Sequence, residues 1–123
     1  MDRESFEKLV EQAFELLPEK FRHALDNLSI VVEDYPTEEI VRKMNLRSAK
    51  QLLGLYQGVP QTHRGTWYGM SPVLPDTISL FQKSIEGACR DDEAVREKVK
   101  EVLIHELGHY FGMNEDEIKK AGY

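Results

Sequence analysis

The stretch His105-Glu106-Leu107-Gly108-His109 lies near the end of a long helical pattern and decides how the whole chain is interpreted. Apolar residues recur at helical spacing from Val95 to Tyr110, with no interruption before Gly108. Asp91 suits the start of this helix and Gly112 suits its left-handed end. We therefore expect a helix of about twenty residues, about 30 Å long, which must cross the core of a small domain.

The two histidines of this stretch are four residues apart. On a helix, side chains at that spacing lie on one face with Cβ atoms about 6 Å apart, so both imidazoles can bind one zinc ion. Glu106 lies about 100° further around the helix than His105, where it can reach a metal-bound water and act as a general base. The alternative is a pair of surface or core histidines that bind no metal.

A catalytic zinc ion needs a third protein ligand and an open position for water. Gly112 lets the chain leave the helix and turn back, so that Glu115 or Asp116 can face the two histidines. Both acids also suit the first turn of a short last helix, where carboxylates are favoured by the helix dipole alone. His23 is expected at the surface. The spacing alone leaves the choice between the two acids open.

Residues 58–75 are rich in glycine and proline, and we expect them to form a long irregular loop. The loop carries His63, Arg64 and Tyr68, which together with Tyr110 are candidates to stabilise a transition-state oxyanion. Packing within the loop is the alternative role. His63 is also the remaining candidate for the third zinc ligand.

The rest of the chain predicts a mixture of helices and strands. Pro18 ends the first helix and opens a second one, whose buried side would be Phe21, Ala24, Leu25 and Leu28. Asn114 followed by Glu117 is close to a capping box for the last helix. The predicted helices cover 6–17, 18–28, 38–43, 92–111 and 115–121, and the predicted strands cover 29–33, 52–56 and 77–82.

Length and composition limit the classes of function. A chain of 123 residues predicts one domain, spanning 1–123. Its 16 basic and 22 acidic residues give a net charge of -6, which argues against binding to nucleic acid or to anionic membranes. The sequence shows no signal peptide or membrane-spanning run, and the single cysteine fits a reducing compartment. We expect a cytoplasmic protein.

The chain resembles the small bacterial zincin-like metalloproteases, sometimes described as minimal zincins. The resemblance covers most of the chain, including 53–60, 74–81 and the long helix. The pattern His105-Glu-x-x-His109-x-x-Gly112-x-x-Glu115 is similar to the extended zinc motif of metzincins. The resemblance implies an α+β fold, with a small twisted mixed sheet packed against N-terminal helices and a long active-site helix.

The resemblance also implies a site. Zn2+ would be held by His105, His109 and Glu115, and Glu106 would be the general base. The sequence departs from the family pattern in having glutamate where the family has aspartate, and because Asp116 follows at once, both acids remain candidates. No methionine follows Met113, so the Met-turn of metzincins is not expected.

These features predict a zinc-dependent metallopeptidase that acts on a peptide or protein. Strand 77–82 is a candidate edge along which the substrate could add as a further strand. The first alternative is a non-catalytic zinc-binding or peptide-docking domain that retains the fold, which the small size favours. The second is a metal-dependent nuclease, because a ribosomal-RNA-processing family shares the histidine spacing. Glu106 and the acidic charge balance argue against the nuclease.

Overall fold

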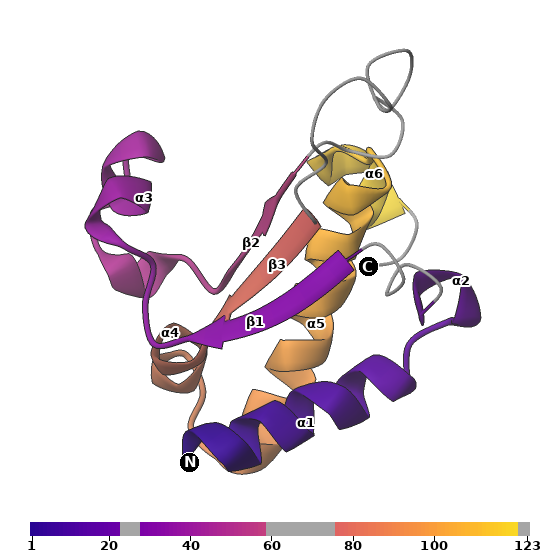
Figure 1. Ribbon diagram of the computed structural model, residues 1–123, viewed down its shortest axis with the longest axis horizontal. Coiled ribbons are helices and arrows are strands. Elements are labelled where there is room, and N and C mark those ends of the chain that lie inside the picture. The colour runs from indigo at the N-terminus through magenta and orange to yellow at the C-terminus, as the bar shows by residue number, and fades with distance from the viewer. Residues whose placement is uncertain (23–27, 59–75, 121–123) are drawn as a thin grey trace.

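The computed structural model describes residues 1–22, 28–58 and 76–120. Helices and strands alternate irregularly along the chain (Figure 1). In order they are α1 (Arg3–Glu15), α2 (Glu19–Arg22), β1 (Leu28–Glu33), α3 (Glu38–Lys43), the 3-10 turn η2 (Ala49–Gln51), β2 (Gly54–Gln57), β3 (Asp76–Phe81), α4 (Gln82–Gly87), α5 (Asp92–Tyr110) and α6 (Glu115–Lys120).

The three strands form a mixed sheet in the order β1-β3-β2. β1 runs parallel to β3, with Ile30 opposite Ile78, and β2 runs antiparallel to it, with Tyr56 opposite Ile78. Five of the six residues of β3 are buried, as expected for the central strand. This confirms the predicted α+β class with a small mixed sheet.

The central position of β3 corrects one prediction. Strand 77–82 cannot be the edge along which a peptide adds, because β1 and β2 occupy both of its sides. The strand also ends one residue earlier than predicted, since Gln82 begins α4, a helix that the sequence patterns did not indicate.

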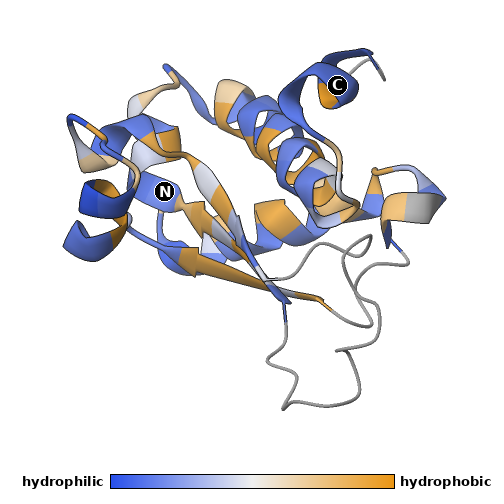
Figure 2. Ribbon diagram, turned by 90° about the horizontal axis from the view of Figure 1, so that it is seen from above, coloured by the Kyte–Doolittle hydropathy of each residue, from blue (hydrophilic) through white to orange (hydrophobic). Residues whose placement is uncertain are grey.

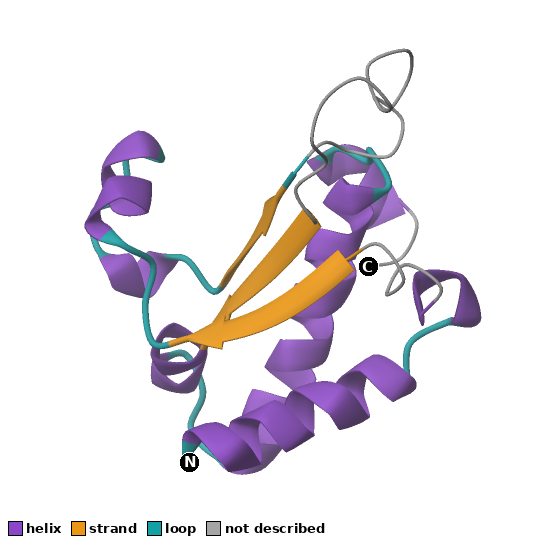
Figure 3. Cartoon of the chain, viewed as in Figure 1, coloured by secondary structure: helices purple, strands orange, loops and turns teal. Residues whose placement is uncertain are grey.

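Helices α1 and α5 build the core against the sheet. Figure 3 shows α5 behind the strands, with α1 crossing near its N-terminal end. The strands carry long hydrophobic stretches, whereas the colours alternate along the helices, as expected for helices with one buried face (Figure 2). Phe6 of α1, Leu103 of α5 and Ile78 of β3 are fully buried. Each such side chain contributes about 1.5–3 kcal/mol of hydrophobic stabilisation.

Both ends of α5 lie where Asp91 and Gly112 predict them. The Asp91 side chain accepts a hydrogen bond from the Ala94 amide at 2.8 Å. At the other end Gly112 has a φ of 81°, its amide donates to the His109 carbonyl, and the Met113 amide donates to the Gly108 carbonyl. These are the two bonds of a Schellman motif, so the chain reverses sharply after the helix. The predicted helix and its glycine end are confirmed.

Other boundaries differ from the predictions. Leu28 is buried but belongs to β1 rather than to the second helix, and Ala24 and Leu25 lie outside the described residues. β2 begins at Gly54, two residues later than predicted, because Leu52 still closes the preceding 3-10 turn. None of the helices in the described ranges is long and apolar enough to cross a membrane.

Candidate metal centre

Two histidines and one glutamate converge where α5 ends and α6 begins. His105 and His109 lie in the last turns of α5, with ring centroids 5.0 Å apart. Glu115 is the first residue of α6. Its Oε1 atom lies 2.9 Å from Nε2 of His105 and 3.2 Å from Nε2 of His109. The three side chains therefore share one small volume.

The turn after α5 and the packing of α6 bring Glu115 to this position. The Schellman motif reverses the chain, and a reciprocal capping box then starts α6. Oδ1 of Asn114 accepts a hydrogen bond from the Glu117 amide at 2.9 Å, and Oε1 of Glu117 accepts one from the Asn114 amide at 3.2 Å. Ile118 packs against Gly108 of α5 so closely that a Cβ on that glycine would lie 2.7 Å from Cγ1 of the isoleucine. The sequence predicted this last helix and its capping pair.

The geometry of the three donors fits a zinc ion. One ligand atom from each of the three side chains lies within 4.8 Å of the other two. Ligands at about 2.1 Å around a tetrahedral ion would be about 3.4 Å apart, slightly more than the two observed contacts to Glu115. Within the described part of the chain this is the sole group of three His, Cys, Asp or Glu side chains that could hold a metal.

The charge state of the acid also suits a metal ligand. Desolvation acts to raise the pKa of Glu115, but hydrogen bonds and charge from His105 and His109 outweigh it and lower the pKa below its usual value. Glu115 is therefore ionised at neutral pH, as a zinc ligand must be.

Glu106 lies in the same cleft but is not a member of the donor group. Only 8% of the residue is exposed, and its Oε1 accepts a hydrogen bond of 2.9 Å from the Tyr56 amide of β2. Burial raises the pKa of Glu106, and the Tyr56 bond and the two histidines oppose that shift only in part. A buried carboxylate with a raised pKa beside a metal site is typical of a general base.

Gly54 permits the close approach of β2 to α5 that this hydrogen bond requires. A Cβ at Gly54 would lie 2.5 Å from Cγ1 of Val102 and 3.5 Å from Cγ of Glu106. The predicted strand 52–56 contains this glycine. An isolated glycine in a strand is a known signal of close backbone approach, so the sequence itself indicates that another element could lie against β2 here.

The cleft around the donors, which we call the metal cleft, has a volume of about 680 Å³. Besides the donors and Glu106, its walls include four apolar side chains from separate segments that the sequence analysis did not assign to the site. They are Met44, Leu52, Leu55 and Met113.

The remaining predicted site residues fall into two groups. Asp116 is exposed on α6 and is not part of the donor group. Tyr110 is only 2% exposed, and its ring packs edge-on against Tyr56 in the core. The other candidates, His23, His63, Arg64 and Tyr68, lie outside the described residues.

Comparison with known families places the chain in the context of a metallopeptidase profile. The sequence profile of the zincin-like metallopeptidases matches residues 25–123, most of the chain, from just before β1 to the last residue. A search of curated proteins finds no match.

Proposed function

The chain belongs to the zincin-like metallopeptidase family, and from that premise we propose that it hydrolyses peptide bonds in a zinc-dependent reaction. The observation that carries the proposal is the position of Glu106. Its buried carboxylate lines the same cleft as the three donors but stands apart from them. A metal site that serves only stability has no use for such a carboxylate beside it.

In this proposal His105, His109 and Glu115 would hold the metal. When bound, zinc would act as a Lewis acid that lowers the pKa of a water molecule towards about 7 and polarises the carbonyl group of the peptide bond. The histidines bind through neutral imidazole nitrogens, and Glu115 contributes the negative charge.

Glu106 moves the proton. It accepts a proton from the attacking water and later delivers it to the amine that leaves. Its raised pKa brings the carboxylate closer to the working pH, which is where a group that both takes and gives a proton is most effective. The Tyr56 amide holds one oxygen of the carboxylate, so the other is available for the water.

The substrate would lie along β2 rather than β3. Among the described strands β2 lies at an edge of the sheet, and it lines the metal cleft through Gly54, Leu55 and Tyr56. The Tyr56 amide points to Glu106, on the side of β2 away from β3, so a peptide on that side reaches the base directly. Met44 and Met113 would then contact its side chains.

The proposal is tested with the wild type and Glu106→Gln, both loaded with zinc, and a diverse peptide mixture analysed by mass spectrometry. We expect equal zinc content and a loss of cleavage of about 10²–10⁴-fold in the variant, the usual contribution of a general base. Asp116→Asn, which changes a neighbouring exposed acid, should cleave like the wild type. Tight zinc binding without cleavage by the wild type would instead support the non-catalytic zinc-binding or peptide-docking domain.

A further inference from the structure

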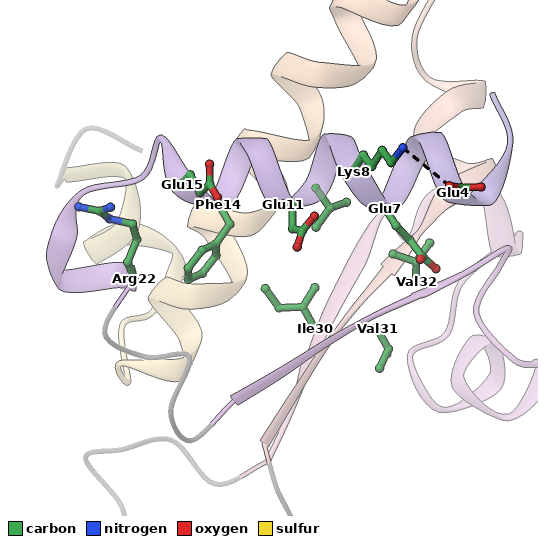
Figure 4. A pocket seen from close by; sticks show the side chains of 11 residues that line it. Glu4, Glu7, Lys8, Glu11, Phe14, Glu15, Arg22, Ile30, Val31 and Val32 are labelled. Carbon is green, nitrogen blue, oxygen red and sulfur yellow. Dashed lines mark ion pairs between the residues drawn. The ribbon is translucent and has the colours of Figure 1, made fainter.

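A second cavity lies at the edge of the sheet opposite to the metal centre. It separates α1 from β1 and has a volume of about 960 Å³, larger than the metal cleft. Phe14, Ile30 and Val32 point into it and give it an apolar floor (Figure 4). Its volume is at the upper end of the range of ligand-binding pockets. We call this cavity the α1–β1 groove.

The α1 wall of the groove is acidic. Glu4, Glu7, Glu11 and Glu15 recur along one side of the helix and all line the cavity. The lining also holds two cations, Lys8, which is paired with Glu4 at 3.7 Å, and Arg22 from α2, so the acidic side chains are in excess. Figure 4 shows the side chains of Glu7 and Glu11 directed towards the space above Ile30 and Val32. A ligand there meets apolar surface and negative charge together.

The other wall is an edge strand with peptide groups directed outward. In the described part of the chain β1 pairs with β3 alone. On its outer side the Val32 carbonyl accepts a hydrogen bond of 2.7 Å from Arg3, whose guanidinium also pairs with Asp34 at 2.6 Å. Because alternate residues of a strand direct their peptide groups to the same side, Ile30 presents its amide and carbonyl to the groove.

From these features we infer that the α1–β1 groove binds an extended basic segment of a partner protein. The segment adds to β1 at Ile30, as in other strand-addition complexes. Its lysine or arginine stems lie over Phe14 and Ile30, and their charged ends meet Glu7 and Glu11. Long basic side chains bury their stems in this way while the charge stays near water. At the end of β1, Arg3 already donates hydrogen bonds to the Val32 carbonyl and to Asp34, so this edge accepts a basic side chain.

The charge of the groove argues against other occupants. Nucleic acids and anionic membranes would be repelled, because the four glutamates of the lining outnumber its two basic side chains. A second copy of this chain, paired edge to edge through β1, would bring two such acidic walls together. Bound metal is not favoured either, because the described residues offer a three-donor group at the metal centre alone.

The strand sets the length of the partner segment. β1 has six residues, which at about 3.3 Å per residue extend over about 20 Å. A peptide of about seven residues that alternates lysine with valine is therefore a suitable probe. A peptide of the same composition with all lysines in one block tests whether charge alone is enough. Both are used with Glu106→Gln protein, so that the proposed peptidase activity does not consume them.

Binding is measured by fluorescence anisotropy at low salt. We expect the alternating peptide to bind more tightly than the block peptide, and Glu7→Gln/Glu11→Gln to weaken it about tenfold. Glu38→Gln/Glu97→Gln, which removes the same charge from α3 and α5, should bind like the parent protein. The Ile30 amide should shift in the NMR spectrum and exchange more slowly with solvent when the peptide is bound.

Equal affinity for both peptides, equal loss in the two double variants, or an unchanged Ile30 amide would overturn the inference. The glutamates would then serve only to keep the exposed edge of β1 from pairing. None of these measurements depends on zinc or on peptide cleavage, so the inference and the proposed function can fail separately.

Discussion

Two carboxylates of the metal cleft, Glu106 and Glu115, have opposite environments. Glu106 is buried and its pKa is raised, whereas Glu115 is exposed on α6 and its pKa is lowered by the histidines that it contacts. A pair of acids separated in this way suits the two roles that we propose, Glu106 as the proton carrier and Glu115 as the charged metal ligand.

The raised pKa of Glu106 predicts a pH-dependent cost in stability. A carboxyl whose folded pKa exceeds its unfolded value of 4.5 favours folding while it is protonated and opposes folding once pH rises through the folded pKa. In the metal-free protein, Glu106→Gln should therefore raise the free energy of unfolding at pH 7, and the gain should disappear below about pH 4.5. Urea denaturation of both proteins at the two pH values measures this. A gain of equal size at both pH values would contradict the burial argument.

The position of Glu115 predicts which acid binds the metal. Glu115→Ala should weaken zinc binding by about 100-fold or more, because even residues that only support a ligand contribute 10–100-fold. Asp116→Ala removes the adjacent acid from the same helical turn and should leave the affinity unchanged. Competition with a chromogenic chelator compares the three proteins. If the two variants lose affinity equally, the assignment of Glu115 is wrong.

At the scale of elements, the site depends on how closely α6 and β2 approach α5. Gly108 accommodates Ile118 of α6, and Gly54 accommodates Val102 of α5. The first contact places Glu115 opposite the histidines, and the second places the Tyr56 amide against Glu106. The two glycines thus position chemical groups that belong to other elements.

Gly108→Ala should move α6. Its Cβ would meet Ile118 at 2.7–2.8 Å, and overpacking of this kind costs about 1–3 kcal/mol, more than the about 0.5–1 kcal/mol that alanine gains in a helix. We expect lower stability and weaker zinc binding. Gly87→Ala is the matched control, because nothing lies within 4 Å of its Cβ position. Thermal denaturation and zinc titration of both variants test the role of the contact, and identical behaviour would exclude it.

The elements that the sequence predicted well are those set by local signals. The capped ends of α5 and the Asn114–Glu117 box of α6 depend on residues a few positions apart, and both are confirmed. The order of the strands depends on pairing between segments far apart in the chain, and there the edge position predicted for β3 was wrong. The bond from Tyr56 to Glu106 spans fifty residues and follows from that same order.

At the scale of the whole molecule, a metal would connect two helices that meet at a tight turn. Its donors come from α5 and α6, so binding needs the folded arrangement of both. Helix α1, by contrast, lies wholly outside the residues that match the family profile, and it forms one wall of the α1–β1 groove.

Removal of the metal should therefore lower the stability of the whole fold. At a free zinc concentration 100 times the Kd, binding to the native state adds about 2.7 kcal/mol, or roughly 10 °C in Tm for a chain of this size. Calorimetry with zinc and with a chelator measures the difference. His105→Ala serves as a control whose Tm should not respond to zinc. An equal Tm for the wild type in both conditions would contradict a metal that links α5 to α6.

X-ray absorption at the zinc edge tests most directly whether two imidazoles, one carboxylate and an open position form the metal centre. For the zinc-loaded wild type we expect two nitrogen ligands and two oxygen ligands at about 2.0–2.2 Å, the second oxygen coming from water. In Glu115→Ala, a further water molecule should take the place of the carboxylate ligand, or the variant should bind no zinc. A spectrum with three imidazoles, or with four protein ligands and no water, would contradict the account.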